Sequence, residues 1–461
     1  MILETYGGAG FVTGSCHILR VNNKTILLDC GLFQGKEDKS GENTRFPFKG
    51  EEIDYVILSH GHIDHSGRIP YLIKNGFKGE VICTKATKDL CEVMLRDSGS
   101  IQEMECDIKN KNRERKGYKL LKPLYTEEDS KRALKYFRGI EYGEKIKLFQ
   151  GVYIKLKDAG HLLGSAITEI YIDDIEDGEE KKLVYSGDIG NNHRPLIEDP
   201  SKINNGDYVI MECTYGDSYH EKEDYFKELM KIIKKTIERK GKVVIPCFSI
   251  GRTQEIIYIL NNLVEKEEIK CKVFVDSPLA KKATEVFNKH SSDFDDEAKK
   301  LLRQGDNPLE FKGLVFTESK EESKAIRKYK EPAIILSSSG MCEGGRIKYH
   351  ILNYLEEEKN SIVFVGYQSP GTLGRDILDK KEYVKILGKK ISVLAEVHKV
   401  PGLSGHGDKR ILLDWIESFQ KKPRKIILVH GEEETRLAFK KELEKKGYCV
   451  LSPEKGCTIK L

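Results

Sequence analysis

The chain has 461 residues, a length typical of two domains, and its 39% hydrophobic content is sufficient for well-packed cores. The formal net charge is only +4, so an anionic partner would have to be attracted by local clusters of Lys and Arg. The 11 cysteines form no Cys-x-x-Cys pair, which favours a reducing compartment over a disulfide-held secreted protein. No apolar run reaches the roughly 20 residues that span a membrane, and the chain opens directly on a predicted strand. We therefore expect a cytoplasmic protein with no membrane partner.

Up to about residue 213, short apolar runs alternate with glycine-containing turns. Residues 24–28 form one such run, and the predicted strand ends at Asp29. Alone, Asp29 would be an ordinary turn residue. Because the strands that follow also end in metal-binding types of side chain, we expect Asp29 to orient a metal-bound imidazole through a hydrogen bond.

The next apolar run, residues 55–58, leads directly into the sequence Ser-His-Gly-His-Ile-Asp-His-Ser-Gly. His60 and His62 lie two residues apart, so in an extended segment they point the same way and can hold one metal ion. Asp64 and His65 follow a turn and can face a second ion. Imidazole and carboxylate without thiolate favour a catalytic zinc site over a closed structural one. A surface loop that is rich in His by chance is the weaker alternative.

Residues 84–107 have the apolar spacing of a helix, and a basic run follows them. The run contains seven cations: Lys109, Lys111, Arg113, Arg115, Lys116, Lys119 and Lys122. We interpret it as a solvated, mobile loop, and attraction of phosphate groups is the alternative.

Three further apolar runs each end in one side chain suited to metal binding or acid–base chemistry. They are residues 154–158 before His161, residues 183–185 before Asp188, and residues 208–211 before Glu212. One such case would carry no information, but the repetition predicts strand ends that converge on one edge of a sheet.

From about residue 214 the pattern changes to strands that alternate with longer helices. Predicted strands lie at 242–246, 273–275, 333–336 and 361–365, and this alternation predicts a parallel sheet flanked by helices. The last segment returns to metal-binding types of side chain. A glycine-rich turn contains His406, and an apolar run at 425–429 ends at His430.

Seven of these groups together suit two metal ions: His60, His62, Asp64, His65, His161, Asp188 and His430. Asp188 is the natural bridge, since a carboxylate has two oxygens and an imidazole cannot span two ions. Water between two such ions ionises near neutral pH, and the ions stabilise the oxygens that attack and leave at phosphorus. The pattern predicts a two-metal hydrolase.

Two candidate residues, Glu212 and His406, are not among the seven predicted metal ligands. A phosphodiester leaving group needs a proton, and an imidazole is the side chain best suited to supply it near neutral pH. We therefore expect His406 to be the general acid, oriented and kept protonated by Glu212. Taken alone, His406 would be interpreted as a turn residue.

The His-rich motif, with the later aspartates and histidine that follow predicted strands, resembles the metallo-β-lactamase fold. Three segments resemble motifs A, B and C of its β-CASP branch: Glu-Cys-Thr-Tyr-Gly from Glu212, Ser-Gly-His ending at His406, and Val-His-Gly-Glu around His430. This branch includes the nuclease subunit of the eukaryotic cleavage and polyadenylation factor and its prokaryotic relatives. Further matches, such as Ser-Pro-Leu-Ala at 277–280, extend the resemblance over essentially the whole chain.

The resemblance implies a metallo-β-lactamase αββα sandwich with an inserted parallel-sheet α/β domain, the β-CASP cap. The expected boundaries are residues 1–213 for the first part of the lactamase-like domain, 214–385 for the cap, and 386–461 for the completion of the first domain with its RNA-specificity segment.

The resemblance also implies two zinc ions per chain and assigns their ligands. One ion would be held by His60, His62 and His161, and the other by Asp64, His65 and His430, with Asp188 bridging. Asp64 and Asp188 would therefore take part in catalysis as metal-binding carboxylates. A His at 430 resembles the RNA-processing members, whereas DNA-repair members tend to carry an apolar residue there.

Residues of the cap are expected to contact RNA. Arg252 opens a predicted helix, and its guanidinium suits a bidentate phosphate contact. Two Gly- and Ser-containing turns can offer backbone N–H groups to phosphates, through Ser338, Ser339, Gly340, Gly371 and Thr372. Ordinary β–α turns are the alternative. Contacts to phosphates predict weak base specificity.

The leading hypothesis is a zinc-dependent ribonuclease that hydrolyses single-stranded RNA, endonucleolytically, in RNA processing or decay. The alternatives are a 5′-to-3′ exoribonuclease of the same family, a catalytically silent RNA-binding scaffold, a small-molecule metallo-hydrolase and a deoxyribonuclease. The cap argues against a small-molecule substrate, and the complete ligand set argues against a silent scaffold. Family members often dimerise, so a homodimer is a further expectation.

Overall fold

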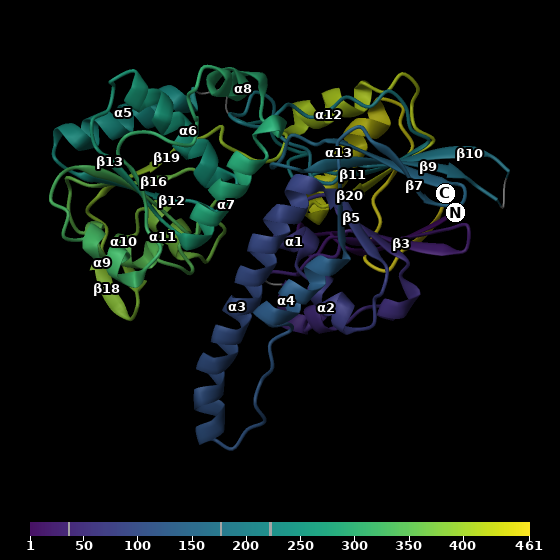
Figure 1. The fold of residues 1–461 in the computed structure, drawn as a ribbon, viewed down its shortest axis with the longest axis horizontal. Helices are drawn as coiled ribbons and strands as arrows, with labels where there is room; N and C mark the ends of the chain where they lie inside the picture. Colours follow the sequence, from purple (N-terminus) through teal and green to yellow (C-terminus); the bar gives the residue numbers. More distant parts are fainter. Residues whose placement is uncertain (36, 176–177, 221–223) are drawn as a thin grey trace. The chain divides into compact units, whose positions relative to one another are not determined.

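The computed structural model describes residues 1–35, 37–175, 178–220 and 224–461. The chain divides into two compact units (Figure 1). Unit 1 comprises Met1–Asn192, Glu198–Tyr219 and Gly405–Leu461, and unit 2 comprises His193–Ile197 and His220–Ser404. In the part of the chain that the structure describes, no helix is both long and apolar enough to cross a membrane.

Unit 1 contains two seven-stranded sheets. In spatial order, the first consists of β22 (Thr458–Lys460), β1 (Ile2–Gly7), β2 (Cys16–Val21), β3 (Lys24–Leu28), β4 (Tyr55–Ile57), β5 (Glu80–Thr84) and β6 (Phe137–Ile140). The second consists of β21 (Val450–Leu451), β20 (Lys425–Val429), β11 (Tyr208–Glu212), β10 (Glu180–Tyr185), β9 (Ala166–Asp173), β8 (Val152–Asp158) and β7 (Lys145–Phe149).

The two sheets pack face to face because their strands are apolar on both sides. In β3, Ile26 and Leu28 belong to the core between the sheets, whereas Leu27 faces the outer layer. In β20, Ile427 faces the inner core and Ile426 faces the outer layer. This alternation follows from the two-residue period of a strand. Because the outer face of each sheet is also apolar, helices must cover it.

Helices cover both outer faces, which completes the αββα sandwich that the sequence predicts. The first sheet is covered by α1 (Ile63–Ser66), α2 (Ile69–Lys74) and α3 (Lys85–Arg115), with α4 (Glu127–Ala133) packed against α3. The second is covered by α12 (Lys409–Glu417) and α13 (Glu433–Lys445). Short 3₁₀ helices lie at η1 (Glu37–Ser40), η2 (Glu42–Thr44), η3 (Gly50–Glu52) and η4 (Leu134–Tyr136).

Strand direction gathers the chemically active side chains at one edge of the second sheet. Strands β10, β11 and β20 are parallel to one another, and β8 runs in the same direction because both β8 and β10 are antiparallel to β9. The residues that follow these four strands therefore emerge together. In the first sheet, β3 and β4 are also parallel, so Asp29 and the His-rich motif emerge side by side.

Unit 2 is built on a six-stranded, entirely parallel sheet, as the strand–helix alternation predicts. Its spatial order is β14 (Leu314–Phe316), β13 (Lys272–Asp276), β15 (Ala333–Ser337), β12 (Lys242–Pro246), β16 (Ser361–Phe364) and β19 (Glu396–Lys399). A separate hairpin pairs β17 (Tyr383–Ile386) with β18 (Lys389–Ser392).

Helices lie on both sides of this sheet (Figure 1). One group consists of α5 (Tyr225–Glu238), α6 (Arg252–Glu265), α7 (Pro278–Lys289) and α8 (Asp296–Arg303), with η5 (Ser291–Asp293) between the last two. The other consists of α9 (Lys320–Ile326), α10 (Ile347–Tyr354) and α11 (Leu373–Leu378), which pack their apolar side chains on the sheet.

Helix α3 extends further than the sequence predicts. The apolar stripe ends near residue 107, but the helix continues to Arg115 through residues of good or neutral helix propensity. It stops at Gly117, which adopts φ +66°. The N–H groups of Tyr118 and Gly117 donate to the carbonyls of Arg113 and Glu114, both at 3.0 Å, the pattern of a Schellman motif. The first half of the basic run is therefore helical and not a loop.

Candidate metal centre

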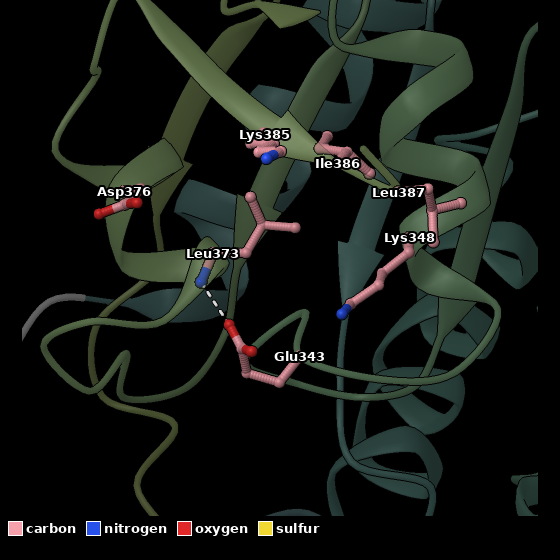
Figure 2. A pocket seen from close by; sticks show the side chains of 7 residues that line it. All are labelled: Glu343, Lys348, Leu373, Asp376, Lys385, Ile386 and Leu387. Carbon is pink, nitrogen blue, oxygen red and sulfur yellow. Dashed lines mark hydrogen bonds between the residues drawn. The ribbon is translucent and has the colours of Figure 1, made fainter. Parts of the chain in front are cut away.

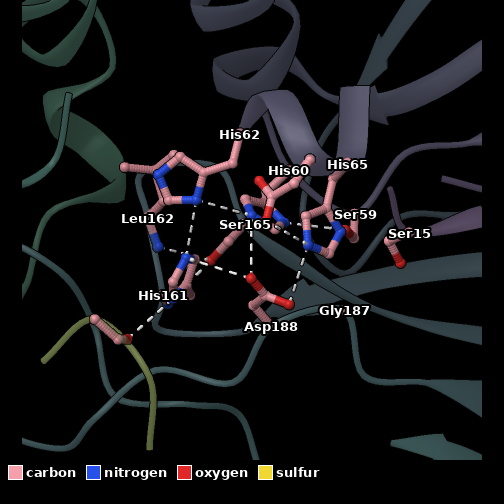
Figure 3. A network of polar contacts seen from close by, with 12 residues as sticks. Ser15, Ser59, His60, His62, His65, His161, Leu162, Ser165, Gly187 and Asp188 are labelled. Carbon is pink, nitrogen blue, oxygen red and sulfur yellow. Dashed lines mark hydrogen bonds and ion pairs between the residues drawn. The ribbon is translucent and has the colours of Figure 1, made fainter. Parts of the chain in front are cut away.

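Four side chains from three strand ends of unit 1 converge on one point. The ligand atoms of His60, His62, His161 and Asp188, the first ligand set, all lie within 4.8 Å of one another. Nδ1 of His62 lies 3.0 Å from Nε2 of His60 and 3.1 Å from Nε2 of His161. Oδ2 of Asp188 lies 3.5 Å from His60 and 3.7 Å from His161. Figure 3 shows these side chains turned toward one another.

The separations in the first ligand set suit a tetrahedral zinc ion. Bonds of 2.0–2.1 Å place neighbouring ligands roughly 3.3 Å apart, close to the distances found here. Burial lowers the pKa of His60 well below its usual range and lowers that of His62 to about 4. Both imidazoles are therefore neutral at physiological pH and have a lone pair available for a metal.

A second group lies beside the first and shares Asp188 with it. Asp64, His65 and His430, the second ligand set, also have ligand atoms within 4.8 Å of one another. Nε2 of His65 lies 3.2 Å from Nε2 of His430, which in turn lies 3.6 Å from Oδ2 of Asp64. Oδ1 of Asp188, the oxygen turned away from His60 and His161, lies 3.3 Å from Nε2 of His65.

Asp188 provides the test of whether a metal fits. Its Oδ1 atom is buried and accepts no hydrogen bond from the described residues. An ionised oxygen in such a place is costly unless a cation compensates it. Burial raises the pKa of Asp188, but His430, His65 and His60 outweigh burial and hold this pKa well below its usual range. The buried carboxylate is therefore an anion, and a bound cation fits beside the oxygen that accepts no hydrogen bond.

Asp29 orients one of the imidazoles. Its Oδ2 accepts hydrogen bonds from Nδ1 of His65 at 2.7 Å, from the hydroxyl of Ser59 at 2.7 Å and from the hydroxyl of Tyr185 at 2.6 Å. With Nδ1 of His65 as donor, its Nε2 keeps the lone pair that faces the second ligand set. Nδ1 of His161 donates in the same way to the carbonyl of Gly405, at 3.0 Å.

Ser59 and Tyr185 were not identified from the sequence. The available signals were their positions, immediately before His60 and three residues before Asp188. Thr214 was not identified either. Its hydroxyl lies 2.7 Å from Oε2 of Glu212 and 3.1 Å from Nδ1 of His430, so it connects Glu212 to the second ligand set.

The Tyr185→Phe substitution tests the support of the second ligand set. It removes one donor from a buried carboxylate, and we expect zinc affinity to fall by about 10- to 100-fold, the usual effect of losing such a partner. Competition with a chromophoric chelator measures this change. Tyr171→Phe is the matched control, because its hydroxyl bonds Glu169 outside both ligand sets. Equal zinc affinities in the two variants would contradict the support role.

His406 lies at the border of the metal-binding groups. Its Nδ1 lies 3.2 Å from Oε1 of Glu212 and 3.9 Å from Oδ2 of Asp188. Burial lowers the pKa of His406, but Glu212, Asp188 and Asp64 outweigh burial and raise it to about 9. His406 also forms a third group with Asp188 and His430 whose ligand atoms lie within 4.8 Å, so coordination is the geometric alternative to acid–base chemistry.

Glu212 is fully buried and positioned by four donors, including His406. Its Oε1 accepts from the N–H of Ile189 at 2.7 Å, and its Oε2 accepts from the N–H and hydroxyl of Thr214 at 3.1 and 2.7 Å. These donors hold the Glu212 carboxylate in one orientation. It can therefore fix the orientation of the His406 ring and stabilise its charged form.

The residues expected to contact RNA lie in unit 2, and their side chains have partners there. The Arg252 side chain is only 10% exposed, and NH1 lies 2.5 Å from Oε2 of the buried Glu255. Arg194 binds the other oxygen of Glu255. A phosphate at Arg252 would therefore compete with Glu255.

The two serine- and glycine-rich turns are bonded internally. The hydroxyl of Ser338 donates to Ser277, and that of Ser339 bonds the backbone of Gly344. Gly340 is buried. Thr372 caps α11 by accepting from the N–H of Arg375 at 3.2 Å, immediately after Gly371 at φ +85°.

A pocket of about 200 Å³ lies near these turns in unit 2 (Figure 2). It is lined by Glu343, Lys348, Leu373, Asp376, Lys385, Ile386 and Leu387. Glu343 closes one side by accepting a hydrogen bond from the N–H of Leu373 at 2.6 Å. Its charged lining consists of two lysines, Lys348 and Lys385, and two carboxylates, Glu343 and Asp376.

Three family models match the chain. The metallo-beta-lactamase superfamily model matches residues 9–127, the Beta-Casp domain matches residues 253–377, and the Zn-dependent metallo-hydrolase RNA specificity domain matches residues 390–453. They follow one another in the order that the sequence motifs predict.

Known proteins resemble the chain over almost its full length. A protein named as a ribonuclease from Thermus thermophilus is 37% identical over 448 residues, covering 97% of this chain and 97% of the relative. Transcription termination factor FttA of Methanocaldococcus jannaschii is 33% identical over 445 residues, covering 94% of this chain and 67% of the relative. A crystal structure of a protein of unknown function from Enterococcus faecalis shares the fold, with a TM-score of 0.57 at 14% identity, covering 100% of this chain and 99% of that one.

The fold, the buried clusters of imidazole and carboxylate, and the full-length similarity lead to the same assignment. The chain belongs to the β-CASP group of the metallo-β-lactamase superfamily and is a metal-dependent hydrolase.

Proposed function

We propose that this protein is a two-zinc ribonuclease that hydrolyses phosphodiester bonds within single-stranded RNA. The observation that carries the proposal is the position of Asp188, whose two oxygens face different groups of imidazoles, His60 and His161 on one side and His65 on the other. This is the arrangement expected of a carboxylate that bridges two ions. The RNA specificity model over residues 390–453 and the ribonuclease from Thermus thermophilus support RNA as the substrate.

Each ligand set has a defined role in this proposal. His60, His62 and His161 would hold one ion, Asp64, His65 and His430 would hold the other, and Asp188 would be shared between them. When bound, the ions supply a water nucleophile at neutral pH and positive charge beside the phosphate.

The remaining groups position and move a proton. His406 donates a proton to the departing ribose oxygen, because the Glu212 carboxylate binds Nδ1 and stabilises the charged ring. Asp29, supported by Ser59 and Tyr185, fixes the ring of His65. These side chains are already bonded to one another, so little reorganisation is needed when the substrate binds.

The cap expected at residues 214–385 is proposed to hold the RNA strand through phosphate contacts. Its loops follow parallel strands and precede helices, an arrangement that places backbone N–H groups at a common edge. Arg252 contributes to this binding only when it exchanges or shares its bond with Glu255.

The test is cleavage of one single-stranded RNA of about 30 nucleotides, labelled in turn at each end, with DNA of the same sequence as control. We expect RNA fragments of intermediate length from both labels and intact DNA. Release of mononucleotides from the 5′ end alone would replace internal cleavage by the exonuclease mode. Intact RNA with hydrolysed DNA would overturn the substrate assignment.

A further inference from the structure

The far end of α3 and the segment that returns from it form a strongly basic arm. Residues 108–122, the basic arm, contain seven basic residues and one acidic residue, a net charge of +6 that exceeds the +4 of the whole chain. In Figure 1 the C-terminal half of α3 extends past α2 and α4, and the chain returns beside it. Every residue from Glu114 to Lys122 is exposed.

Most of the cations on the basic arm are uncompensated. Lys109 pairs with Glu105 at 3.1 Å, and Nε of Arg113 donates to the carbonyl of Lys119 at 2.8 Å. Among the described residues, the other five side chains have no hydrogen-bond or ion-pair partner; they are Lys111, Arg115, Lys116, Lys119 and Lys122. The helix dipole accounts for cations in the last turn of α3, but not for Lys119 and Lys122, which follow the Schellman turn.

The basic arm is held together by hydrogen bonds and also exposes apolar surface. The Asn110 side chain holds the returning segment at both hydrogen-bonding groups of Leu121, donating to its carbonyl at 2.9 Å and accepting from its N–H at 2.8 Å. Tyr118 is 58% exposed, with the Arg113 guanidinium 5.7 Å from its ring centroid. Leu120 is 50% exposed. An exposed ring among unpaired cations is the combination that binds unstacked bases and their phosphates.

The base of α3 touches the metal centre. Gly61, between His60 and His62, packs against α3. A Cβ atom placed on Gly61 would lie 3.5–3.7 Å from the side chains of Leu90, Cys91 and Met94. From Met94 to Arg115 a helix that rises 1.5 Å per residue covers about 30 Å. A nucleic acid strand advances about 3.4 Å per nucleotide when stacked, so a strand of about ten nucleotides can reach from the metal centre to the basic arm.

We propose that the basic arm is a docking site for single-stranded RNA, which holds the strand by its phosphates about ten nucleotides away from the cleavage point. This proposal rests on the proposed function. Charge selects a polyanion, and the exposed Tyr118 ring favours a nucleic acid over an acidic protein, which has no bases to stack. The arm gives long RNA an advantage that short RNA does not have.

The test compares K116Q/K119Q/K122Q with K421Q/K441Q/K445Q, a matched removal of three exposed lysines from the opposite outer layer of unit 1. Both are made in the H406A background, which slows cutting, and binding of a fluorescent 20-nucleotide RNA is measured over a range of salt concentrations. We expect the arm variant to lose about tenfold in affinity at 0.1 M salt. The slope of log affinity against log salt should become less steep by about 2 in the arm variant, because each of the three lost phosphate contacts contributes roughly 0.7. The control should match the parent.

Two further measurements sharpen the result. Y118A should lower affinity about fivefold or more without changing the salt slope, because base stacking does not release counterions. A six-nucleotide RNA cannot reach from the metal centre to the basic arm, so its affinity should differ between the arm variant and its parent by less than that of the 20-nucleotide RNA. If polyglutamate of equal charge displaced the RNA at equal concentration, the arm would be a site for acidic protein segments, and the proposal would be overturned.

Unchanged affinity and slope in the arm variant would overturn the proposal while leaving RNA cleavage intact. If the wild-type protein failed to cut RNA, the proposed function would fail, whatever the arm variants bind. The two failures are therefore distinguishable.

Discussion

Asp188→Ala is expected to abolish RNA cleavage and to remove most of the bound zinc. The substitution deletes a carboxylate that faces both ligand sets, 3.5 Å from His60 through one oxygen and 3.3 Å from His65 through the other. The imidazoles that remain face one another without a shared anion, so binding of two dications becomes unfavourable. Metal analysis and cleavage of labelled RNA, measured on the same preparation, check both parts.

The control for this prediction separates metal loss from unfolding. Asp188→Asn keeps the volume of the side chain but loses its charge, and it should lose zinc while the protein still unfolds cooperatively. Asp173→Ala removes an exposed carboxylate from the end of β9 and should retain zinc and activity. An Asp188→Ala protein with two zinc ions and normal cleavage would contradict the bridging role.

His406→Ala is expected to keep the zinc ions and to slow cleavage by about 10²–10⁴, the usual contribution of a positioned acid. His406 is 22% exposed and bonds Glu212 through Nδ1, so the ring is oriented by Glu212 and accessible from solvent. If His406 were instead a metal ligand with Asp188 and His430, the variant would lose zinc. Zinc content and the cleavage rate together distinguish the two roles.

The pH dependence gives a second measurement of the same residue. A general acid must be protonated, and the carboxylates around His406 raise its pKa to about 9, so the rate should fall as pH rises toward that value. Bound cations oppose this shift, and we therefore expect the fall below pH 9. Glu212→Gln should move it to lower pH, toward the ordinary histidine pKa of about 6.5. A profile that is the same in the wild type and in His406→Ala would remove His406 from proton transfer.

The same pKa has a consequence for stability. A histidine whose pKa is raised on folding stabilises the folded state fully below its unfolded pKa, about 6.5, and this contribution is lost as pH rises to about 9. Below pH 6 the His406–Glu212 pair should therefore contribute fully to the free energy of unfolding.

The sequence was sufficient to predict that the side chains proposed to bind metal converge. His161, Asp188 and His430 are far apart in the chain, but each follows an apolar run that forms β8, β10 or β20. Because these strands run in the same direction, prediction of the strands was enough to place their ends together. The parallel sheet of unit 2 followed from the alternation of predicted strands and helices, whereas the αββα layers were expected from the resemblance to the metallo-β-lactamase fold.

Side-chain partners could not be predicted in this way. The bond between Tyr185 and Asp29 joins strands of two different sheets, and nothing in the local sequence of either residue indicates it. The pair between Arg252 and Glu255 is local, three residues apart on α6, but its burial depends on Arg194 from a distant segment. The length of α3 was underestimated because its second half lacks an apolar stripe and is supported by propensity and the Gly117 stop.

The most direct test of the account is zinc titration of the metal-free protein, with cleavage of end-labelled single-stranded RNA as the readout. We expect no cleavage without metal and a rate that rises to a plateau at two equivalents of zinc per chain. Full activity in the metal-free protein, or a plateau at one equivalent, would contradict a two-metal centre bridged by Asp188.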